Sequence, residues 1–266
     1  MRELKMNNQS IGVFDSGVGG LTVLEELHRA LPNEHLIFVG DNAHSPYGDK
    51  SVAQLKQYSS EIVEYFLQQQ VKMIVLACNT TSCTVLDYLK ERYPQVPIIG
   101  VIDTTVSMVN AKTMDKVAIM ATQATIESQA YQKGIGMDRS IGIACPKLVP
   151  LIENGTTQQI LHQELHILLD EVTKECHNIV LGCTHYPIIA SDIKALYPHI
   201  RLFSSSVAVV GEVERMLEKL KLRHSDASPK KNLVYTTGNL ELFKQASRIF
   251  FNSSDFIFKK LTLKVA

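Results

Sequence analysis

Val75-Leu76-Ala77-Cys78-Asn79-Thr80 and Val180-Leu181-Gly182-Cys183-Thr184-His185 are two similar stretches of the chain, and in each a hydrophobic run leads to a cysteine. Continuous apolar runs of this length are typical of parallel strands that are buried on both faces, and we expect such strands over 73–77 and 178–182. In open α/β sheets, ligands bind beyond the carboxyl ends of the strands. Both cysteines are therefore expected at a ligand-binding edge.

The similarity extends upstream of the two cysteines. A strand is expected over 11–14, ending at Asp15, and another over 117–121, ending at Thr122. The pattern predicts an α/β protein of two pseudo-symmetric domains with parallel sheets and an active site in the crevice between them. We expect residues 1–102 and 208–266 to form the first domain and residues 103–207 the second. One thiol would then lie on either side of the bound molecule.

Composition limits the classes of function. The chain has 266 residues, which is enough for two domains, and its 27 basic and 27 acidic side chains give a net charge of zero. Neither a nucleic-acid partner nor an acidic membrane surface is expected. Residues 1–10 lack the apolar region of a signal peptide, and the odd number of cysteines, five, favours free thiols. We expect a cytoplasmic protein with a small-molecule substrate, and the sequence leaves open whether the chain forms a homodimer.

Strand and helix patterns alternate along the chain, as in a right-handed parallel sheet. Helices are expected over 22–31, 52–69, 84–92, about 125–134, 156–175, 188–196, 207–220 and 240–250. Further strands are expected over 36–40, 96–101, about 141–144, 200–203, 233–236 and 256–263, with a solvated loop over 221–232. The last strands have no counterpart in the repeat, so we expect them to return to the first domain.

The five cysteines are not equivalent. Cys83, Cys145 and Cys176 have the character of inert buried side chains. Cys78 and Cys183 each follow a strand directly, and each is expected to open a helix. The N–H groups of a helix N-terminus lower a thiol pKa from about 8.5 toward neutrality, so either thiol could act as a base.

Zinc is the competing use of cysteine and histidine in this sequence. Cys176, Cys183 and His185 could supply ligands, but no Cys-x-x-Cys pair is present. Cys176 also precedes the strand that carries Cys183 to the opposite edge. We therefore expect no metal site.

The stretch Asp15-Ser16-Gly17-Val18-Gly19-Gly20 is compatible with several motifs. A dinucleotide fingerprint would need glycine where Thr22 stands, and a Walker loop would need a Gly-Lys-Ser/Thr sequence. Aspartic proteases carry Asp-Ser/Thr-Gly in pairs on all-β folds. The remaining interpretation is a glycine turn that presents Asp15 to move or orient a proton and Ser16 to hold an anion.

The segment from Gly40 to Gly48, Gly-Asp-Asn-Ala-His-Ser-Pro-Tyr-Gly, is long for a connection between a strand and a helix. By itself it could be an ordinary surface loop. Because it follows the carboxyl end of a strand next to the Asp15 strand, we interpret it as a lip that contacts the substrate.

The motifs Asp-Ser-Gly-x-Gly-Gly, Pro-Tyr-Gly, Cys-Asn-Thr and Gly-Cys-Thr-His-Tyr-Pro occur in this order. With them the sequence resembles the glutamate racemases of the aspartate/glutamate racemase superfamily, from Ile11 to about Thr237. The resemblance implies interconversion of L- and D-glutamate without a cofactor, with D-glutamate supplied to peptidoglycan. His44, Ser204-Ser205-Ser206 and Gly238-Asn239 depart from the family's usual residues.

The resemblance also implies residue roles. Cys78 and Cys183 would be the two acid/base thiols, with Asp15 supporting Cys78, and with His185 and Glu153 supporting Cys183. The residues implied to hold the substrate are Asp15, Ser16, Pro46, Tyr47, Gly48, Asn79, Thr80, Thr122, Thr125, Thr184 and His185. The chemistry agrees with these roles, because a carbanion formed without pyridoxal needs directed donors in a site that excludes water.

Two other classes of function fit parts of the pattern. The chain could be an aspartate racemase, or another isomerase or a decarboxylase of the same superfamily, although a decarboxylase needs only one proton-donating thiol. A two-lobed amino-acid-binding protein would share the crevice. Such a protein would need export and would have no use for reactive thiols.

Overall fold

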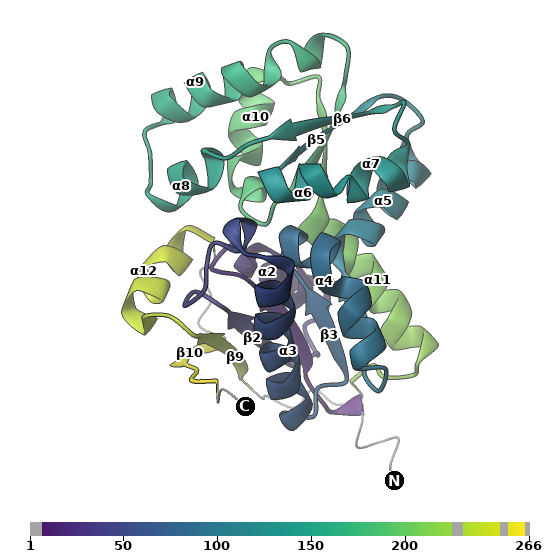
Figure 1. Ribbon diagram of the computed structural model, residues 1–266, viewed down its shortest axis with the longest axis vertical. Helices are drawn as coiled ribbons and strands as arrows, with labels where there is room; N and C mark the ends of the chain where they lie inside the picture. Colours follow the sequence, from purple (N-terminus) through teal and green to yellow (C-terminus); the bar gives the residue numbers. More distant parts are fainter. Residues whose placement is uncertain (1–6, 225–230, 251–254, 264–266) are drawn as a thin grey trace.

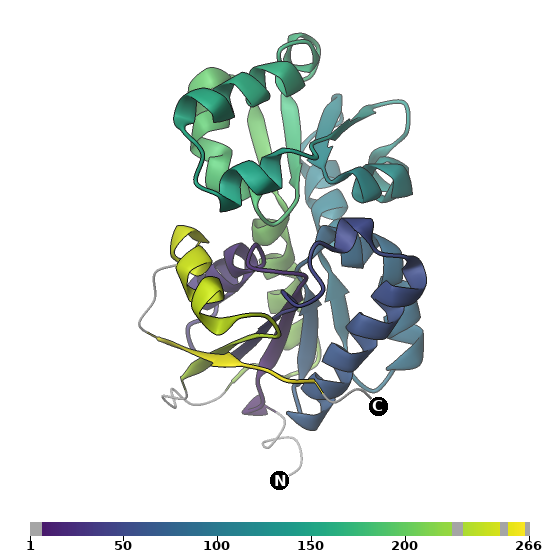
Figure 2. The same ribbon diagram turned by 60° about the vertical axis from the view of Figure 1, so that its left-hand side comes forward.

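The computed structural model describes residues 7–224, 231–250 and 255–263. Two parallel sheets form the centres of two α/β domains, drawn one above the other in Figure 1 and seen from a second direction in Figure 2. The predicted fold class is therefore confirmed. None of the helices in the described ranges combines the length and the apolar character that crossing a bilayer requires.

The first four strands of each half of the chain are arranged in the same order in their sheet: second, first, third, fourth. In the described residues, the larger sheet runs β10-β9-β2-β1-β3-β4 and the smaller runs β6-β5-β7-β8. The strands of the larger sheet are β1 (Ile11–Asp15), β2 (Leu36–Gly40), β3 (Met73–Leu76), β4 (Ile98–Gly100), β9 (Asn232–Thr236) and β10 (Phe256–Lys260). Those of the smaller are β5 (Val117–Ala121), β6 (Ser140–Ala144), β7 (Asn178–Gly182) and β8 (Arg201–Ser204). The first strand of each half lies between the second and the third, so the halves repeat one topology.

The central strands of the larger sheet, β1, β2 and β3, are buried along their whole length because nearly all of their residues are apolar. Along β1, Ile11 and Val13 pack into the cluster that contains α2, α11 and α12, whereas Phe14 packs into the cluster that contains α3 and α4. The helices are α2 (Leu21–Ala30), α3 (Val52–Gln68), α4 (Asn79–Arg92), α5 (Val101–Lys112), α6 (Gln123–Ser128), α7 (Ala130–Ile135), α8 (Leu148–Glu153), α9 (Gln158–Leu169), α10 (Ala190–Leu196), α11 (Ser205–Lys219) and α12 (Leu240–Phe250). Short 3₁₀ turns are η1 (Tyr47–Asp49), η2 (Val172–Lys174) and η3 (Tyr186–Ile189).

Two helices carry the chain between the sheets. After β4, α5 leads from the larger sheet to the smaller, and α11 leads back after β8. The two helices pack against each other. β9 then pairs with the outer edge of β2, and β10 pairs with β9, both in parallel. Because α5 and α11 span the expected boundaries at residues 102 and 207, the domain limits stay a prediction.

The structure corrects several predicted elements. The strand expected over 96–101 covers only Ile98–Gly100, because Val101 begins the unpredicted helix α5. The helix expected from residue 84 begins at Asn79.

Further corrections concern the second half of the chain and its end. The helix expected over 125–134 is two helices, separated at Gln129 by a left-handed backbone with φ 57°. The helix expected over 156–175 ends at Leu169, α8 was not predicted, and the last strand ends at Lys260. Within the loop expected over 221–232, residues 225–230 lie outside the described residues.

A buried ion pair joins distant segments at the amino-terminal edge of the larger sheet. The Lys72 side chain is 0% exposed, and its Nζ lies 2.5 Å from Glu34 Oε2. The same ammonium donates hydrogen bonds to the carbonyls of Asn7 (2.8 Å) and Leu222 (2.7 Å). Glu34 Oε1 accepts from the backbone N–H of His224 at 2.9 Å. The pair therefore fixes the segments before β1 and after α11 against the sheet.

Lys72→Met should destabilise the protein by about 3–5 kcal/mol, because it leaves the Glu34 carboxylate buried without its cation. The midpoint of urea unfolding measures the change. Adding Glu34→Gln to Lys72→Met should restore part of the loss. The control is Lys116→Met, which breaks an exposed pair with Glu175 and should change the midpoint far less. Equal midpoints for Lys72→Met and Lys116→Met would contradict the prediction.

Candidate active site

The carboxyl ends of the two sheets meet at the junction of the domains, where the predicted site residues lie. Cys78 follows β3 and is 6% exposed; Cys183 follows β7 and is 7% exposed. Among the residues that the structure describes, three side-chain hydrogen bonds cross the junction. Thr22 Oγ1 donates to the Thr184 carbonyl (2.8 Å), Thr80 Oγ1 lies 3.2 Å from Thr122 Oγ1, and Tyr131 donates to Asn79 Oδ1 (2.6 Å). The two half-sites therefore form one closed, buried region.

Cys78 caps the N-terminus of α4. Its Sγ accepts from the Thr81 N–H at 3.5 Å and donates to Ser16 Oγ at 3.5 Å. Burial, together with the negative charge of Asp15, raises the pKa of the Cys78 thiol to about 11. The expectation that the helix N-terminus brings this pKa toward neutrality is therefore wrong, because desolvation outweighs the N–H donors.

Cys183 lies in a different setting. Its Sγ is 3.8 Å from His185 Nδ1, and His185 Nε2 is 2.7 Å from Glu153 Oε1, at the end of α8. The three residues predicted to act together are thus in contact. Cys183 was expected to open a helix, and this prediction is wrong. The 3₁₀ turn η3 begins only at Tyr186, and α10 begins at Ala190. Histidine, not a helix N-terminus, is the group that faces this sulfur.

His185 is strongly perturbed. Burial disfavours its charged form, but hydrogen bonds to Cys183 and Glu153, together with their negative charges, outweigh burial and raise the His185 pKa to about 10. We therefore expect an imidazolium at neutral pH. Its ring also packs edge-on against Phe250 of α12, with 5.3 Å between the ring centres.

Asp15 is 1% exposed at the end of β1. Its Oδ2 accepts the backbone N–H groups of Gly17 and Gly20, both at 3.0 Å, while Oδ1 is buried without a hydrogen-bond partner among the described residues. Burial raises the Asp15 pKa to about 6, although the charge of His185 opposes the shift. Asp15 therefore interacts with His185 as well as with Cys78, whereas the sequence linked it to Cys78 alone.

The glycines after Asp15 serve close packing. A Cβ atom on Gly19 would lie 2.4 Å from the His185 ring, and one on Gly20 would lie 2.3 Å from Asp15 Cβ. Neither glycine has a positive φ. The sequence suggested that glycine was needed for a tight turn; the structure shows that it is needed because His185 and Asp15 leave no room for a side chain.

Hydroxyl groups of the second half-site form a short chain. Thr122 caps α6 by accepting from the Thr125 N–H at 3.3 Å, and the two hydroxyls lie 3.0 Å apart. Thr80 continues this chain across the junction. Beside it, Asn79 Nδ2 is buried with no hydrogen-bond partner among the described residues. The site thus contains an unused donor in Asn79 and an unused acceptor in Asp15.

The lip lies at the edge of this region. Pro46 and Gly48 are exposed, whereas Tyr47 is 2% exposed, and η1 packs against α4 and against α6 of the second domain. The Tyr47 hydroxyl donates to Asp41 Oδ2 at 2.6 Å.

Sequence reasoning missed Thr22, Tyr131 and Asp41 as parts of this region. Thr22 stands where a dinucleotide-binding motif would have its last glycine. At the level of the sequence Thr22 served only to exclude that motif, and no role was predicted for it. Asp41 lay inside the predicted lip without a role. No sequence signal marked Tyr131.

The ligand set considered for zinc is not brought together. Cys176 Sγ donates to the carbonyls of Lys116 and Asn178, at the amino-terminal end of β7, whereas Cys183 follows its carboxyl end. Over the part of the chain that the structure describes, no three His, Cys, Asp or Glu side chains are grouped closely enough to hold a metal ion.

This chain is similar in sequence and in structure to known proteins. The family model of the Asp/Glu/hydantoin racemases matches residues 11–213. A glutamate racemase from Carboxydothermus hydrogenoformans is 39% identical over 264 residues, which cover 96% of this chain and 97% of the relative. The crystal structure of a glutamate racemase isoform from Bacillus anthracis matches with a TM-score of 0.90 at 32% identity, covering 98% of this chain and 100% of that chain. That of a glutamate racemase from Francisella tularensis in complex with D-glutamate matches with a TM-score of 0.88 at 31% identity, covering 97% and 98%.

Glu153→Gln should lower the pKa of His185 from about 10, because it removes a carboxylate that stabilises the imidazolium. Titration of ¹⁵N-labelled histidine by NMR measures this value. A raised histidine pKa stabilises the fold fully at pH values below 6.5, the ordinary pKa of histidine. This stabilisation is lost as the pH rises through about 10. Between these pH values the wild type should lose more stability than Glu153→Gln.

The control for this titration is Glu127→Gln, which alters an exposed carboxylate hydrogen-bonded to Gln123. It should leave the His185 titration unchanged. An unchanged His185 pKa in Glu153→Gln would show that the contact with Glu153 does not hold the proton.

Proposed function

Because the chain belongs to the Asp/Glu/hydantoin racemase family, we propose that it interconverts L- and D-glutamate without a cofactor. The observation that carries the proposal is the pair of buried cysteines at the carboxyl ends of equivalent strands, β3 and β7. The matched relatives are glutamate racemases, which favours glutamate over aspartate as the substrate. In this family D-glutamate supplies peptidoglycan synthesis, a cytoplasmic role that suits a chain whose cysteines are free.

The proposed reaction moves one proton across the plane of the α-carbon. A thiolate on one face removes the α-proton, and the electron pair of the broken C–H bond stays on the α-carbon and the adjoining carboxylate. The thiol on the other face then gives its proton to the same carbon, which inverts the configuration. The two sulfurs have exchanged protonation states, and exchange with solvent restores them.

The supporting groups follow from the contacts of each sulfur. The His185 imidazolium, held by Glu153, faces Cys183 and stabilises negative charge on that sulfur. Burial keeps Cys78 in its thiol form, with Asp15 and Ser16 beside it. The positive ammonium of a bound amino acid would offset the charge of Asp15 and so favour ionisation of Cys78 when Cys78 acts as the base.

The unpartnered groups suit an amino-acid substrate. Asp15 Oδ1 can accept from an ammonium, and Asn79 Nδ2 can donate to a carboxylate. The hydroxyls of Ser16, Thr80, Thr122, Thr125 and Thr184 add neutral donors without charge or bulk. Closure around the substrate excludes water, which strengthens these interactions while the carbanion is present. Two opposed thiols would be redundant in a decarboxylase or in an amino-acid-binding protein.

L-Glutamate mixed with the purified protein and a chelator should lose its circular dichroism signal, and L-aspartate should react more slowly. Cys78→Ala and Cys183→Ala should each abolish the loss, because a two-base path has no bypass, while circular dichroism of the protein shows an intact fold. Cys83→Ala is the matched control on α4 and should stay active. Faster turnover of aspartate, or a need for added pyridoxal phosphate, would overturn the proposal.

Racemisation of L-glutamate in D₂O tests the two-sided geometry. D-Glutamate should carry deuterium from its first appearance, while the remaining L-glutamate stays almost unlabelled. The reason is that one sulfur removes the α-proton and the other sulfur delivers a deuteron that came from the solvent. Mass spectrometry after chiral separation measures both labels. Early and equal labelling of the two enantiomers would instead indicate a single base that serves both faces.

A further inference from the structure

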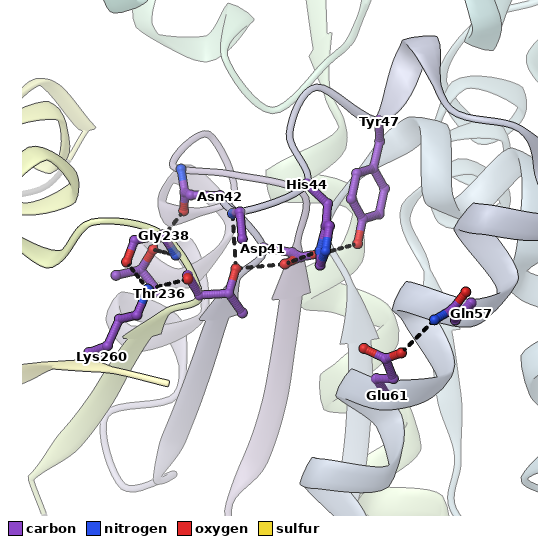
Figure 3. Close-up of polar contacts among 11 residues, drawn as sticks. Asp41, Asn42, His44, Tyr47, Gln57, Glu61, Thr236, Gly238 and Lys260 are labelled. Atoms are coloured by element: carbon purple, nitrogen blue, oxygen red, sulfur yellow. Dashed lines mark hydrogen bonds and ion pairs between the residues drawn. The ribbon is translucent and has the colours of Figure 1, made fainter. Parts of the chain in front are cut away.

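A buried carboxylate behind the lip is not used by the proposed reaction. Asp41 follows β2 and is 0% exposed. Its Oδ2 accepts from the Tyr47 hydroxyl at 2.6 Å, and its Oδ1 accepts from the Thr237 hydroxyl at 2.6 Å. The Nδ1 atom of His44 lies 2.9 Å and 3.0 Å from the two oxygens. Figure 3 shows the side chains of Tyr47 and His44 pointing toward Asp41.

The three donors come from separate parts of the larger sheet's carboxyl edge. Tyr47 and His44 belong to the lip, whereas Thr237 follows β9, nearly two hundred residues later in the chain. Thr237 Oγ1 also accepts from the Ala43 N–H at 3.0 Å, and Lys260 of β10 donates to the Thr237 and Gly238 carbonyls. Asp41 therefore fastens the lip to the strands that complete the sheet.

The hydroxyl of Tyr47 is not free to contact a substrate. It is committed to Asp41, and the Tyr47 ring is held edge-on against Phe14, with ring centres 6.1 Å apart. Burial and the negative charge of Asp41 raise the Tyr47 pKa well above 10, so the hydroxyl stays a donor. His44 is fixed by stacking on Tyr58 of α3, with ring centres 3.8 Å apart and an 11° angle between the planes.

We propose that Asp41 is a positioning residue for substrate binding, which holds residues 45–48 of the lip at the domain junction through its contacts with Tyr47, His44 and Thr237. The inference rests on the proposed function. What Asp41 fixes is the backbone at Pro46 and Gly48, which is exposed, while η1 packs against α6 of the second domain. The lip then contributes binding groups at a set position, and the thiols are unaffected because Asp41 makes no hydrogen bond to either.

Tyr47→Phe removes only the hydroxyl and should raise KM for L-glutamate about tenfold, the effect of losing one hydrogen bond to a charged group, while kcat changes less than about threefold. Asp41→Asn and Thr237→Val should act in the same direction. Tyr47→Phe combined with Asp41→Asn should be no worse than the stronger single variant, because both disrupt the same contact. A residue that only stabilises the fold would not give this KM-specific, non-additive pattern.

Gln57→Ala is the matched control. Gln57 belongs to α3, and its side chain donates a hydrogen bond to Glu61 at 3.0 Å (Figure 3). It makes no hydrogen bond to Asp41. It should leave KM unchanged. Equal KM values for Tyr47→Phe and wild type, a fall in kcat alone, additive effects in the double variant, or the same rise in Gln57→Ala would each overturn the proposal.

Amide hydrogen exchange separates this inference from the proposed function. In the substrate-free protein, Tyr47→Phe should speed exchange at residues 43–50 and leave exchange in β1 and β3 unchanged. If wild-type protein fails to racemise glutamate, the proposed function fails, and the exchange rates still decide whether Asp41 holds the lip. Unchanged exchange at the lip would reject the anchoring role.

Discussion

Parallel strands bring polar residues to the middle of the molecule, where each must find a partner away from water. At this junction the partner is often on the other domain. Thr22 bonds the carbonyl of Thr184, Thr80 meets Thr122, and Tyr131 bonds Asn79. The closed arrangement of the domains therefore depends on pairing between the two sheet ends, and the groups left over, on Asp15 and Asn79, are those that a charged ligand can satisfy.

The topological repeat does not make the two half-sites chemically equal. Cys78 sits at a helix N-terminus beside a carboxylate, and burial keeps it protonated; Cys183 faces an imidazolium held by Glu153. A racemase must work in both directions with its two thiols in opposite ionisation states. In the proposed reaction, the imidazolium of His185 stabilises negative charge on Cys183. Ionisation of Cys78 depends more on the positive ammonium group of the bound substrate.

The sequence predicted the parts of the fold that buried apolar runs encode. The bounds of β2, β5 and β7 agree with the structure because such runs have sharp ends. α5 was missed because the run around Ile98–Val101 reads equally well as one longer strand. Cys183, His185 and Glu153 were linked only through the family resemblance; the structure places them in contact, and their roles stay a prediction. Asp41 could not be found in this way, because its role depends on Thr237, whose approach follows from the pairing of β9 with β2.

The late return of β9 has a consequence for how the chain is made. A ribosome releases β1 to β4 first, then the whole of the smaller sheet, and only afterwards the strands that cover β2. Throughout that interval the edge of Leu36–Gly40 is an open row of backbone donors and acceptors in an apolar segment, which invites pairing with other chains. The smaller sheet, by contrast, is built from one continuous segment of the chain, so all of its strands are made before β9. We therefore expect the speed of translation between β8 and β9 to affect the yield of folded protein.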